Sequence, residues 1–307
     1  MTIFMELERD RSERVRYDYP DYPAYIRRGL LSHYPNYTAP SHWHDDVELI
    51  AVLSGGMDYN VNGQIIPLGP GGGIFINARQ LHYGFSSGSR ECEFFCILLH
   101  PSALCASPAF ERSFVSPVTG NGALPFAVLG PGIPWQAEIL GGIRQIYEEK
   151  DRPGAALRIQ STFCKIWALL YEQMPQNTPE LPQAEWNSRQ LLLLKEMIGF
   201  LQQHYAEKLT LADIAAAGHV CQSKCCALFR RYLSRTPMSY LTDYRLTRSA
   251  ELLRNTDRSV TEIGYACGFT SASYYAETFR KWIGCSPKEY RSSGHGASFS
   301  AFGPAQE

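Results

Sequence analysis

The chain has 307 residues, of which 45% are hydrophobic, and carries a formal net charge of −1 at pH 7. That length and apolar content suffice for two domains with their own cores. No apolar run reaches the roughly 18 residues of a membrane-spanning helix, and the charged N-terminal stretch does not resemble a secretory signal. We therefore expect a soluble, cytoplasmic protein with no membrane partner, whose nine cysteines stay reduced because they show no paired spacing.

Charge is unevenly distributed along the chain. Residues 188–292 contain fifteen Lys or Arg against nine Asp or Glu, a balance of +6, while the rest has fourteen against twenty-one, a balance of −7. A basic segment attracts phosphates whatever the base sequence, and an acidic segment is repelled by them. The two parts are therefore expected to do different jobs, with nucleic acid as the partner of the basic part.

Residues 1–24 are charged and rich in tyrosine without periodicity, and we interpret them as an N-terminal arm. From Tyr25 to about Leu99, short apolar runs are separated by Gly, Pro and Asn: AYIRRGLL, VELIAVLSG, MDYNVNGQIIPL, GIFIN, HYGFS and EFFCILL. This spacing predicts a β-sandwich or barrel, which we assign to residues 25–115. Asn62–Gly63 predicts a two-residue hairpin, because both central positions of a type I′ turn need a positive φ.

The segment HWHDDVE, from His42 to Glu48, is the richest in chemically active side chains. On an extended strand His42 and His44 point to one face, and Glu48 shares their parity. His82 comes from a later strand, so four groups capable of binding a metal could converge inside a barrel. The same parity turns Trp43 away from the histidines, which favours a core or interface position for it.

This set of residues resembles the cupin family over about residues 25–100. The resemblance implies a barrel that binds a small molecule and, in some members, a divalent metal held by the HxH pair, the following Glu and the later His. Both alternatives stay open here: a pocket that hydrogen-bonds a hydroxyl-rich or carboxylated ligand, or a bound metal ion. We expect the pocket without a cofactor, formed by His42, His44, Glu48 and His82.

Residues 116–174 contain two stretches of helical periodicity, 134–150 and 154–174. Their wide apolar stripes are expected either to cover the barrel or to pair with a second subunit, and we predict a homodimer. Residues 175–187 contain three prolines and predict an interdomain linker.

Residues 188–292 contain one helical unit twice. LFRRYLSRTPMSY, from Leu228, returns as TFRKWIGCSPKEY from Thr278, and each copy follows a capped apolar helix start, TLADIAAAG or SVTEIGYACG. Each short helix ends near a glycine and a second helix follows, predicted from Gln222 to about Leu233 and from Ser271 to about Ile283, which is the pattern of helix-turn-helix motifs. The segment from Met238 to Thr256 predicts one rigid helix that joins them and holds two recognition helices at the spacing of successive DNA grooves. The tail, residues 293–307, has the composition of a disordered end.

Over residues 188–292 the chain resembles the DNA-binding domain of the AraC family of transcription regulators, on RLTRSAELL, SVTEIGYACGF and SYYAETFRKWIGCSPKEYR in the expected order. With the barrel in front, the resemblance implies an α+β protein of two domains: a cupin-like barrel with a helical dimerisation segment, then an all-α double helix-turn-helix. Alignment to the family implies that eight residues face DNA bases: Ser223, Lys224, Cys226, Ala227, Ala272, Ser273, Ala276 and Glu277. Six basic residues are interpreted as phosphate contacts or ion-paired surface: Arg230, Arg231, Arg245, Arg248, Arg280 and Lys281.

The resemblance implies a ligand-responsive, sequence-specific DNA-binding regulator, commonly an activator of carbohydrate use, that contacts RNA polymerase and is not an enzyme. Its effector is expected to be a small molecule such as a sugar. A metal-dependent cupin enzyme with an appended nucleic-acid module is one alternative, which metal analysis discriminates. An architectural protein that binds all DNA sequences alike is another, which competition with random DNA discriminates.

Overall fold

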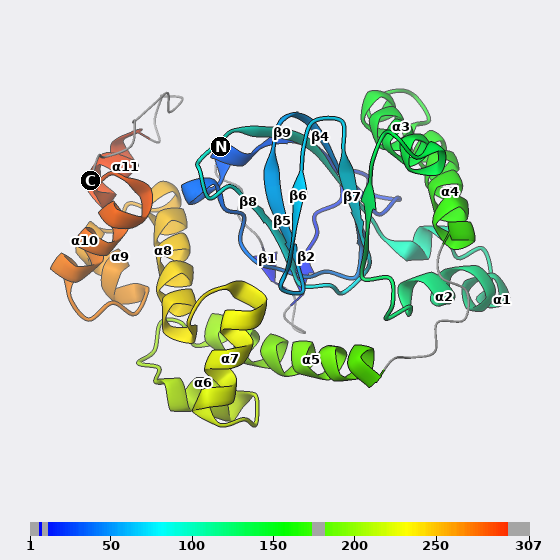
Figure 1. Cartoon of the computed structure of the whole chain (residues 1–307). Coiled ribbons are helices and arrows are strands. Elements are labelled where there is room, and N and C mark those ends of the chain that lie inside the picture. The colour runs from blue at the N-terminus through cyan, green and yellow to red at the C-terminus, as the bar shows by residue number, and fades with distance from the viewer. Residues whose placement is uncertain (1–5, 8–11, 174–181, 294–307) are drawn as a thin grey trace. The chain divides into compact units, whose positions relative to one another are not determined.

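The structure is a computed structural model that describes residues 6–7, 12–173 and 182–293 (Figure 1). The chain forms two compact units, the first of residues 1–195 with 230–234 and the second of residues 196–229 with 235–307. The first is rich in sheet and the second is helical, so the expected α+β class with two domains is confirmed. Most of the predicted linker and nearly all of the predicted tail lie outside the described residues.

Two antiparallel sheets build the first unit. The five-stranded sheet has the order β10 (Phe126–Leu129), β7 (Gly73–Ile76), β4 (Val47–Gly55), β9 (Cys92–Leu99) and β3 (Ala24–Leu30). The three-stranded sheet has the order β6 (Gln64–Leu68), β5 (Met57–Val61) and β8 (His82–Phe85). A short pair, β1 (Glu6–Leu7) and β2 (Glu13–Arg14), precedes them.

The hairpin predicted at Asn62–Gly63 joins β5 to β6, with φ of 52° at Asn62 and 85° at Gly63. All six apolar runs of the sequence form strands, as predicted. One strand was missed: β10 lies within the segment that we expected to be helical, and it pairs with β7. Its run of four residues, Phe126–Leu129, is too short to carry a periodicity of its own.

Strand alternation gives the five-stranded sheet two apolar faces. In β4, Ile50 and Val52 pack between the two sheets, in one cluster with Met57 and Tyr59 of β5. Their neighbour Leu49 points the other way, into a second cluster that the helices cover. Since side chains alternate along a strand, burial of six consecutive residues of β4, from Val47 to Val52, shows that the strand is covered on both faces.

The helices α3 (Pro134–Glu149) and α4 (Ala155–Gln173) lie side by side beside this sheet (Figure 1). Their apolar stripes are buried in the cluster on the outer face of the sheet, including Ile139 and Ile143 of α3 and Phe163 and Trp167 of α4. The expectation that these helices cover the barrel is therefore confirmed, whereas Leu157 of α4 is 78% exposed and is not part of the buried stripe.

Short helical segments connect β9 to β10: η3 (Pro101–Leu104), α1 (Pro108–Phe110), η4 (Glu111–Val115) and α2 (Ser116–Thr119). Two more, η1 (Leu31–His33) and η2 (Pro35–Tyr37), follow β3.

The helical unit follows the predicted repeat. After α5 (Pro182–Gln203), the first module is α6 (Leu211–Ala217) and α7 (Gln222–Leu233), and the second is α9 (Val260–Ala266) and α10 (Ala272–Ile283). Between them stands the long α8 (Pro237–Asn255), which contacts α6 on one side and α9, α10 and α11 (Pro287–Ser293) on the other (Figure 1). The predicted joining helix is thus confirmed, and α5 begins before residue 188, where the predicted domain starts.

Each module begins with a capping box. The Thr210 side chain accepts from the Asp213 backbone N–H while the Asp213 carboxylate accepts from the backbone N–H of Thr210. Ser259 and Glu262 repeat this arrangement in the second module. Such reciprocal bonds satisfy backbone donors that a helix start leaves open, so both helices begin where the sequence predicts.

The two modules fill the space between their helices differently. Gly264 of α9 lies so close to α10 that a Cβ there would be 2.8 Å from Cδ1 of the buried Tyr275. The equivalent positions of the first module, by the repeat, are Ala215 and Cys225, both buried. A small residue opposite a large one in the second module thus replaces two residues of intermediate size, which keeps the core filled.

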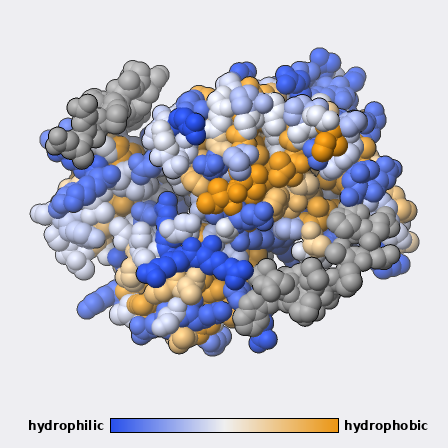
Figure 2. Space-filling model, in the orientation of Figure 1, coloured by the Kyte–Doolittle hydropathy of each residue, from blue (hydrophilic) through white to orange (hydrophobic). Residues whose placement is uncertain are grey.

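Apolar side chains gather on the face of the sheet-rich unit that is turned toward the viewer (Figure 2). Within the described part of the chain, no helix is long and apolar enough to cross a membrane.

Candidate functional site

Four side chains converge in the barrel: His42, His44, Glu48 and His82, whose candidate ligand atoms all lie within 4.8 Å of one another. Their convergence was predicted from parity, but the local structure differs. Only Glu48 and His82 lie in regular strands; His42 and His44 lie in the segment before β4, where His42 forms an isolated bridge with His82. That bridge brings the two segments together, with backbone hydrogen bonds between His42 and His82 of 3.2 and 3.0 Å.

The three imidazoles are oriented by the backbone. Nδ1 of His42 lies 2.9 Å from the Pro40 carbonyl oxygen, and Nδ1 of His82 lies 2.9 Å from that of Gln80. Nδ1 of His44 lies 3.0 Å from the carbonyl oxygen of Asp46. A carbonyl can only accept, so each Nδ1 carries the proton, and in the neutral ring Nε2 is then the atom with a free lone pair.

Two of these Nε2 atoms lie at Glu48, and that of His42 lies 3.4 Å from the Glu13 carboxylate. Its Oε2 lies 2.9 Å from Nε2 of His82 and 3.3 Å from Nε2 of His44, and Oε1 accepts a short hydrogen bond from the Tyr59 hydroxyl. Histidines held at Nδ1 by backbone oxygens, with Nε2 turned to a common centre beside a carboxylate, have the arrangement of metal ligands. The donor set of three imidazoles and one carboxylate suits zinc, iron, manganese or nickel.

The charges of neighbouring side chains in this cluster shift the pKa values of His42, His44 and Glu48. Burial pulls the pKa of His42 well below its usual range, and the neighbouring His82 and His44 add to this. Burial would also lower the pKa of His44, but its hydrogen bond to Glu48 and the Glu48 charge raise it. Burial acts to raise the pKa of Glu48, and the charges and hydrogen bonds of His82 and His44 outweigh it and hold that pKa well below its usual range. The centre thus holds a charged carboxylate among imidazoles, an arrangement that suits a cation.

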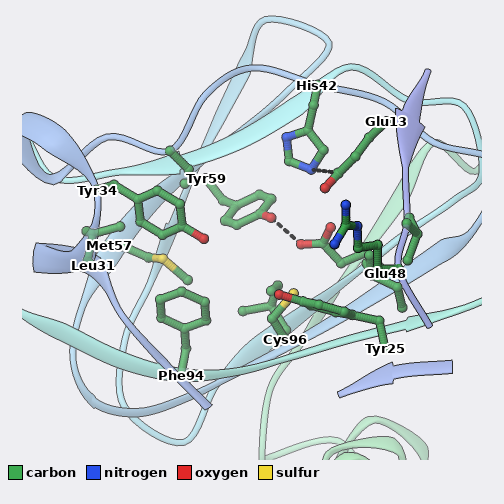
Figure 3. Close-up of a pocket in the computed structure, with 16 residues that line it drawn as sticks. Glu13, Tyr25, Leu31, Tyr34, His42, Glu48, Met57, Tyr59, Phe94 and Cys96 are labelled. Atoms are coloured by element: carbon green, nitrogen blue, oxygen red, sulfur yellow. Dashed lines mark hydrogen bonds and ion pairs between the residues drawn. The ribbon is translucent and has the colours of Figure 1, made fainter. Parts of the chain in front are cut away.

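A cavity opens directly beside the cluster (Figure 3). Its polar end holds Glu13, His42 and Glu48, with the Glu13 carboxylate 3.4 Å from Nε2 of His42. Burial raises the pKa of Glu13 to about 7, and the charges of Glu48 and Asp46 add to the rise while His44 opposes it. The opposite end is walled by Leu31, Met57 and Phe94 with Tyr34 beside them, and Tyr25 and Tyr59 lie between the two ends.

Sequence reasoning found the histidines and Glu48 but missed Glu13 and the tyrosines. Glu13 belongs to the arm, which has no periodicity, although its backbone N–H donates to the Trp43 carbonyl and so fixes it near the cluster. Tyr59 shares the inward parity of β5 with Met57. The alternation of side chains along β5 could therefore have identified Tyr59 from the sequence. Trp43 is buried outside the cavity lining, as its parity predicted.

In the helical unit, the eight residues assigned to DNA bases lie on α7 and α10, and all are exposed or partly exposed. The buried residues of α10 are Tyr275 and Phe279, so the assigned face points away from the core. The Glu277 carboxylate accepts a hydrogen bond of 2.7 Å from Lys281 Nζ, which lowers the pKa of Glu277 and raises that of Lys281. An exposed pair of this kind is weak and leaves both groups able to exchange partners.

Arg245 and Arg248 also make specific contacts within the unit. Arg245 donates from Nε to the Tyr205 carbonyl and from Nη2 to the Glu207 carbonyl, both at 2.7 Å. Arg248 forms an ion pair of 2.5 Å with Glu251. These contacts favour a structural role for Arg245. Arg230 and Arg280 lie exposed on the recognition helices, and Arg231 donates a hydrogen bond of 3.4 Å to Gln190 Oε1.

The sequence matches two family models. One, described as an AraC-like ligand binding domain, covers residues 27–165, and the other, described as a helix-turn-helix domain, covers residues 214–293. In the second region Ile214, Phe229, Ile263, Phe269 and Phe279 are buried and Trp282 is partly buried.

Relatives match over most of the chain. The uncharacterized HTH-type transcriptional regulator YdeC of Bacillus subtilis (strain 168) is 29% identical over 252 residues, 82% of this chain and 86% of that protein. The melibiose operon regulatory protein of Escherichia coli (strain K12) is 24% identical over 278 residues, 88% of this chain and 89% of that protein. A solved transcriptional regulator from Chromobacterium violaceum, with an AraC-type DNA-binding domain, is 32% identical, covers 34% of this chain and 92% of that structure, and has a TM-score of 0.33.

Proposed function

Because the chain belongs to the AraC family of transcription regulators, we propose that it binds specific promoter sequences through its two helix-turn-helix modules and responds to a small molecule in its barrel. The observation that carries this proposal is the repeated pair of capped helices, held by the single helix α8. One rigid connection fixes the separation of two recognition helices, and successive major-groove segments on one face of DNA are about 34 Å apart.

Base recognition is assigned to the exposed faces of α7 and α10. On the first, Lys224 and Ala227 supply a donor and an apolar contact; on the second, Ala276 and Glu277 supply a methyl group and an acceptor for a cytosine amine. Exposed Arg280 and Lys281 near the end of α10 are assigned to phosphates, which position the helix without reading sequence.

Competition binding tests this assignment. At fixed salt, DNA from the promoter of the gene itself should bind at least about a thousandfold tighter than random DNA of equal length. Equal affinities would instead support the architectural alternative.

Variants test the roles of single residues. Glu277→Gln should change preference at one base pair, whereas Arg280→Gln should weaken binding to all sequences equally and reduce the salt dependence by about one phosphate contact. Arg112→Gln, at an exposed arginine of the barrel unit, is the matched control.

The partners follow from this function. We propose a homodimer that works in the cytoplasm, contacts RNA polymerase and carries no enzymatic activity. The regulated genes are proposed to serve carbohydrate or related small-molecule metabolism, since one relative is named for the melibiose operon. Reporter expression from the chain's own promoter, with and without the gene, would show activation or repression.

We also propose a divalent metal ion as a cofactor of the barrel, held by Nε2 of His42, His44 and His82 and by Glu48. The support is the orientation of three imidazoles by carbonyl oxygens toward one carboxylate. In a regulator such an ion would bind and orient the oxygen atoms of an effector. The same four groups are the one observation in favour of a metal-dependent enzyme.

Elemental analysis of the purified protein tests the metal. About one zinc, iron, manganese or nickel ion per chain is expected, and His82→Ala should remove most of it because the ligand set would fall from four to three. His204→Ala, at a histidine of the helical unit whose contact is an exposed Glu207, is the control and should retain the ion. Absence of any ion from protein purified without chelators, with no stabilisation by added metal, would overturn the proposal.

A further inference from the structure

The cavity beside the four-residue cluster is divided into a polar and an apolar half. Glu13, His42 and Glu48 stand at one end, and Leu31, Met57 and Phe94 form the other (Figure 3). A sugar carries hydroxyl groups around its whole ring. In this cavity, some of those hydroxyls would face Leu31, Met57 and Phe94 without a partner, and each buried unsatisfied hydroxyl is costly.

Two tyrosine hydroxyl groups in the cavity lining are available to hydrogen-bond a ligand. The Tyr25 and Tyr34 side chains point their oxygens into the cavity (Figure 3), and neither has a hydrogen-bond partner among the residues that the structure describes. The third tyrosine differs, because the Tyr59 hydroxyl donates to Glu48. A ligand with one oxygen could therefore bond to these free hydroxyls while its apolar body packs between the aromatic rings.

The charge of the lining argues for an uncharged ligand. Two carboxyl groups, Glu13 and Glu48, line the cavity together with Arg16 and His42, so groups that favour opposite ligand charges stand side by side. Neither sign of ligand charge thus has a consistent partner. A neutral hydroxyl, in contrast, can donate to a carboxylate and accept from a tyrosine at the same time.

The size of the cavity fits one ring. Its volume is about 70 Å³. A buried water needs roughly 10–15 Å³ of such space, so the cavity admits a small molecule with at most one ring and few substituents.

From this arrangement we propose that the effector of the barrel is an uncharged one-ring phenol, with its hydroxyl among Glu13, Tyr25 and Tyr34 and its ring against Met57 and Phe94. This inference rests on the proposed ligand-responsive function and narrows its effector. It does not rest on the metal, because a simple phenol binds through hydrogen bonds and apolar contact alone.

Calorimetric titration of the full-length protein with phenol, benzoate and D-galactose tests the ligand class, before and after treatment with a chelator. Phenol should bind at least tenfold tighter than either of the others in both preparations. If benzoate or D-galactose binds as tightly as phenol, or if none of the three binds, the inference is wrong. Promoter binding by the same sample is measured separately, so a failure of the effector class is distinguished from a failure of the regulator.

Variants locate the hydroxyl contact. Tyr34→Phe removes a group that has no partner in the free protein, so folding should be unaffected, while loss of one hydrogen bond should weaken phenol binding about twofold to tenfold. Tyr25→Phe should act in the same direction. Tyr22→Phe is the control, since its hydroxyl donates 2.8 Å to Gln160 away from the cavity, and phenol affinity should not change. Unchanged affinity in both Tyr34→Phe and Tyr25→Phe would overturn the assignment.

Discussion

Gly264→Ala should reveal how tightly the second helix-turn-helix module is packed. The new Cβ would lie 2.8 Å from Cδ1 and 3.1 Å from Cγ of Tyr275. The Tyr275 ring has little freedom to retreat, because it is fully buried and contacts Phe269 and Phe279, with centroids 5.0 and 5.8 Å away. The methyl group must therefore move α10 relative to α9.

Two opposing effects set the magnitude. Overpacking a filled core costs about 1–3 kcal/mol, whereas replacing a helical glycine by alanine gains about 1 kcal/mol in helix propensity. The net change should be between roughly zero and 2 kcal/mol of destabilisation. Gly141→Ala in α3 is the matched control, because no atom lies within 4 Å of a Cβ placed there, so only the gain remains.

Hydrogen–deuterium exchange followed by mass spectrometry measures both changes in the full chain, since it reports the opening free energy of each helix separately. Peptides of α9 and α10 should exchange as fast as wild type or faster in Gly264→Ala, and peptides of α3 should exchange more slowly in Gly141→Ala. If the α9 and α10 peptides of Gly264→Ala gained as much protection as the α3 peptides of Gly141→Ala, the close packing of Gly264 against Tyr275 would be refuted. Weaker promoter binding by Gly264→Ala is expected as well, because α10 carries half of the proposed base contacts.

Further tests address the caps and turns of the same module. Ser259→Ala should destabilise α9 by about 1 kcal/mol, measured as faster exchange, and an unchanged rate would contradict the capping box. Hydrogen bonds from the Ser259 side chain and backbone lower the pKa of Glu262 below its ordinary 4.5. The contribution of the Glu262 carboxylate to stability is therefore complete above pH 4.5 and is lost as the pH falls through the lowered pKa. The difference in stability between the wild type and Glu262→Gln should vanish on acidification. Gly268→Ala should destabilise by more than 1 kcal/mol, because φ is +82° and a Cβ would lie 2.7 Å from the Tyr205 carbonyl; calorimetric melting would test this, and an unchanged midpoint would count against it.

Much of the fold follows from local patterns in the sequence. The hairpin at Asn62–Gly63 and the two capped helix starts are signals that act over a few residues, and each appears where predicted. The strand β10 was missed because its pairing with β7 is made across fifty residues of intervening chain. No local pattern encodes such a partner.

The candidate site was only partly predictable. Strand parity brought Glu48 and the histidines together, because a period of two fixes which side chains share a face. Glu13 reaches the same centre from a segment without periodicity, held by a backbone hydrogen bond to Trp43. In the helical unit, charge alone did not separate Arg245, which bonds to two backbone carbonyls, from Arg280, which lies exposed on α10.

The carbonyl oxygens that hold the three histidines have a consequence for selectivity. Each ring loses the freedom to turn over and present its other nitrogen, so the donor atoms are arranged before any guest arrives. Binding then pays little entropy for ordering side chains, and the cavity discriminates by fit. A guest whose size or geometry demands a different spacing would have to break those anchors.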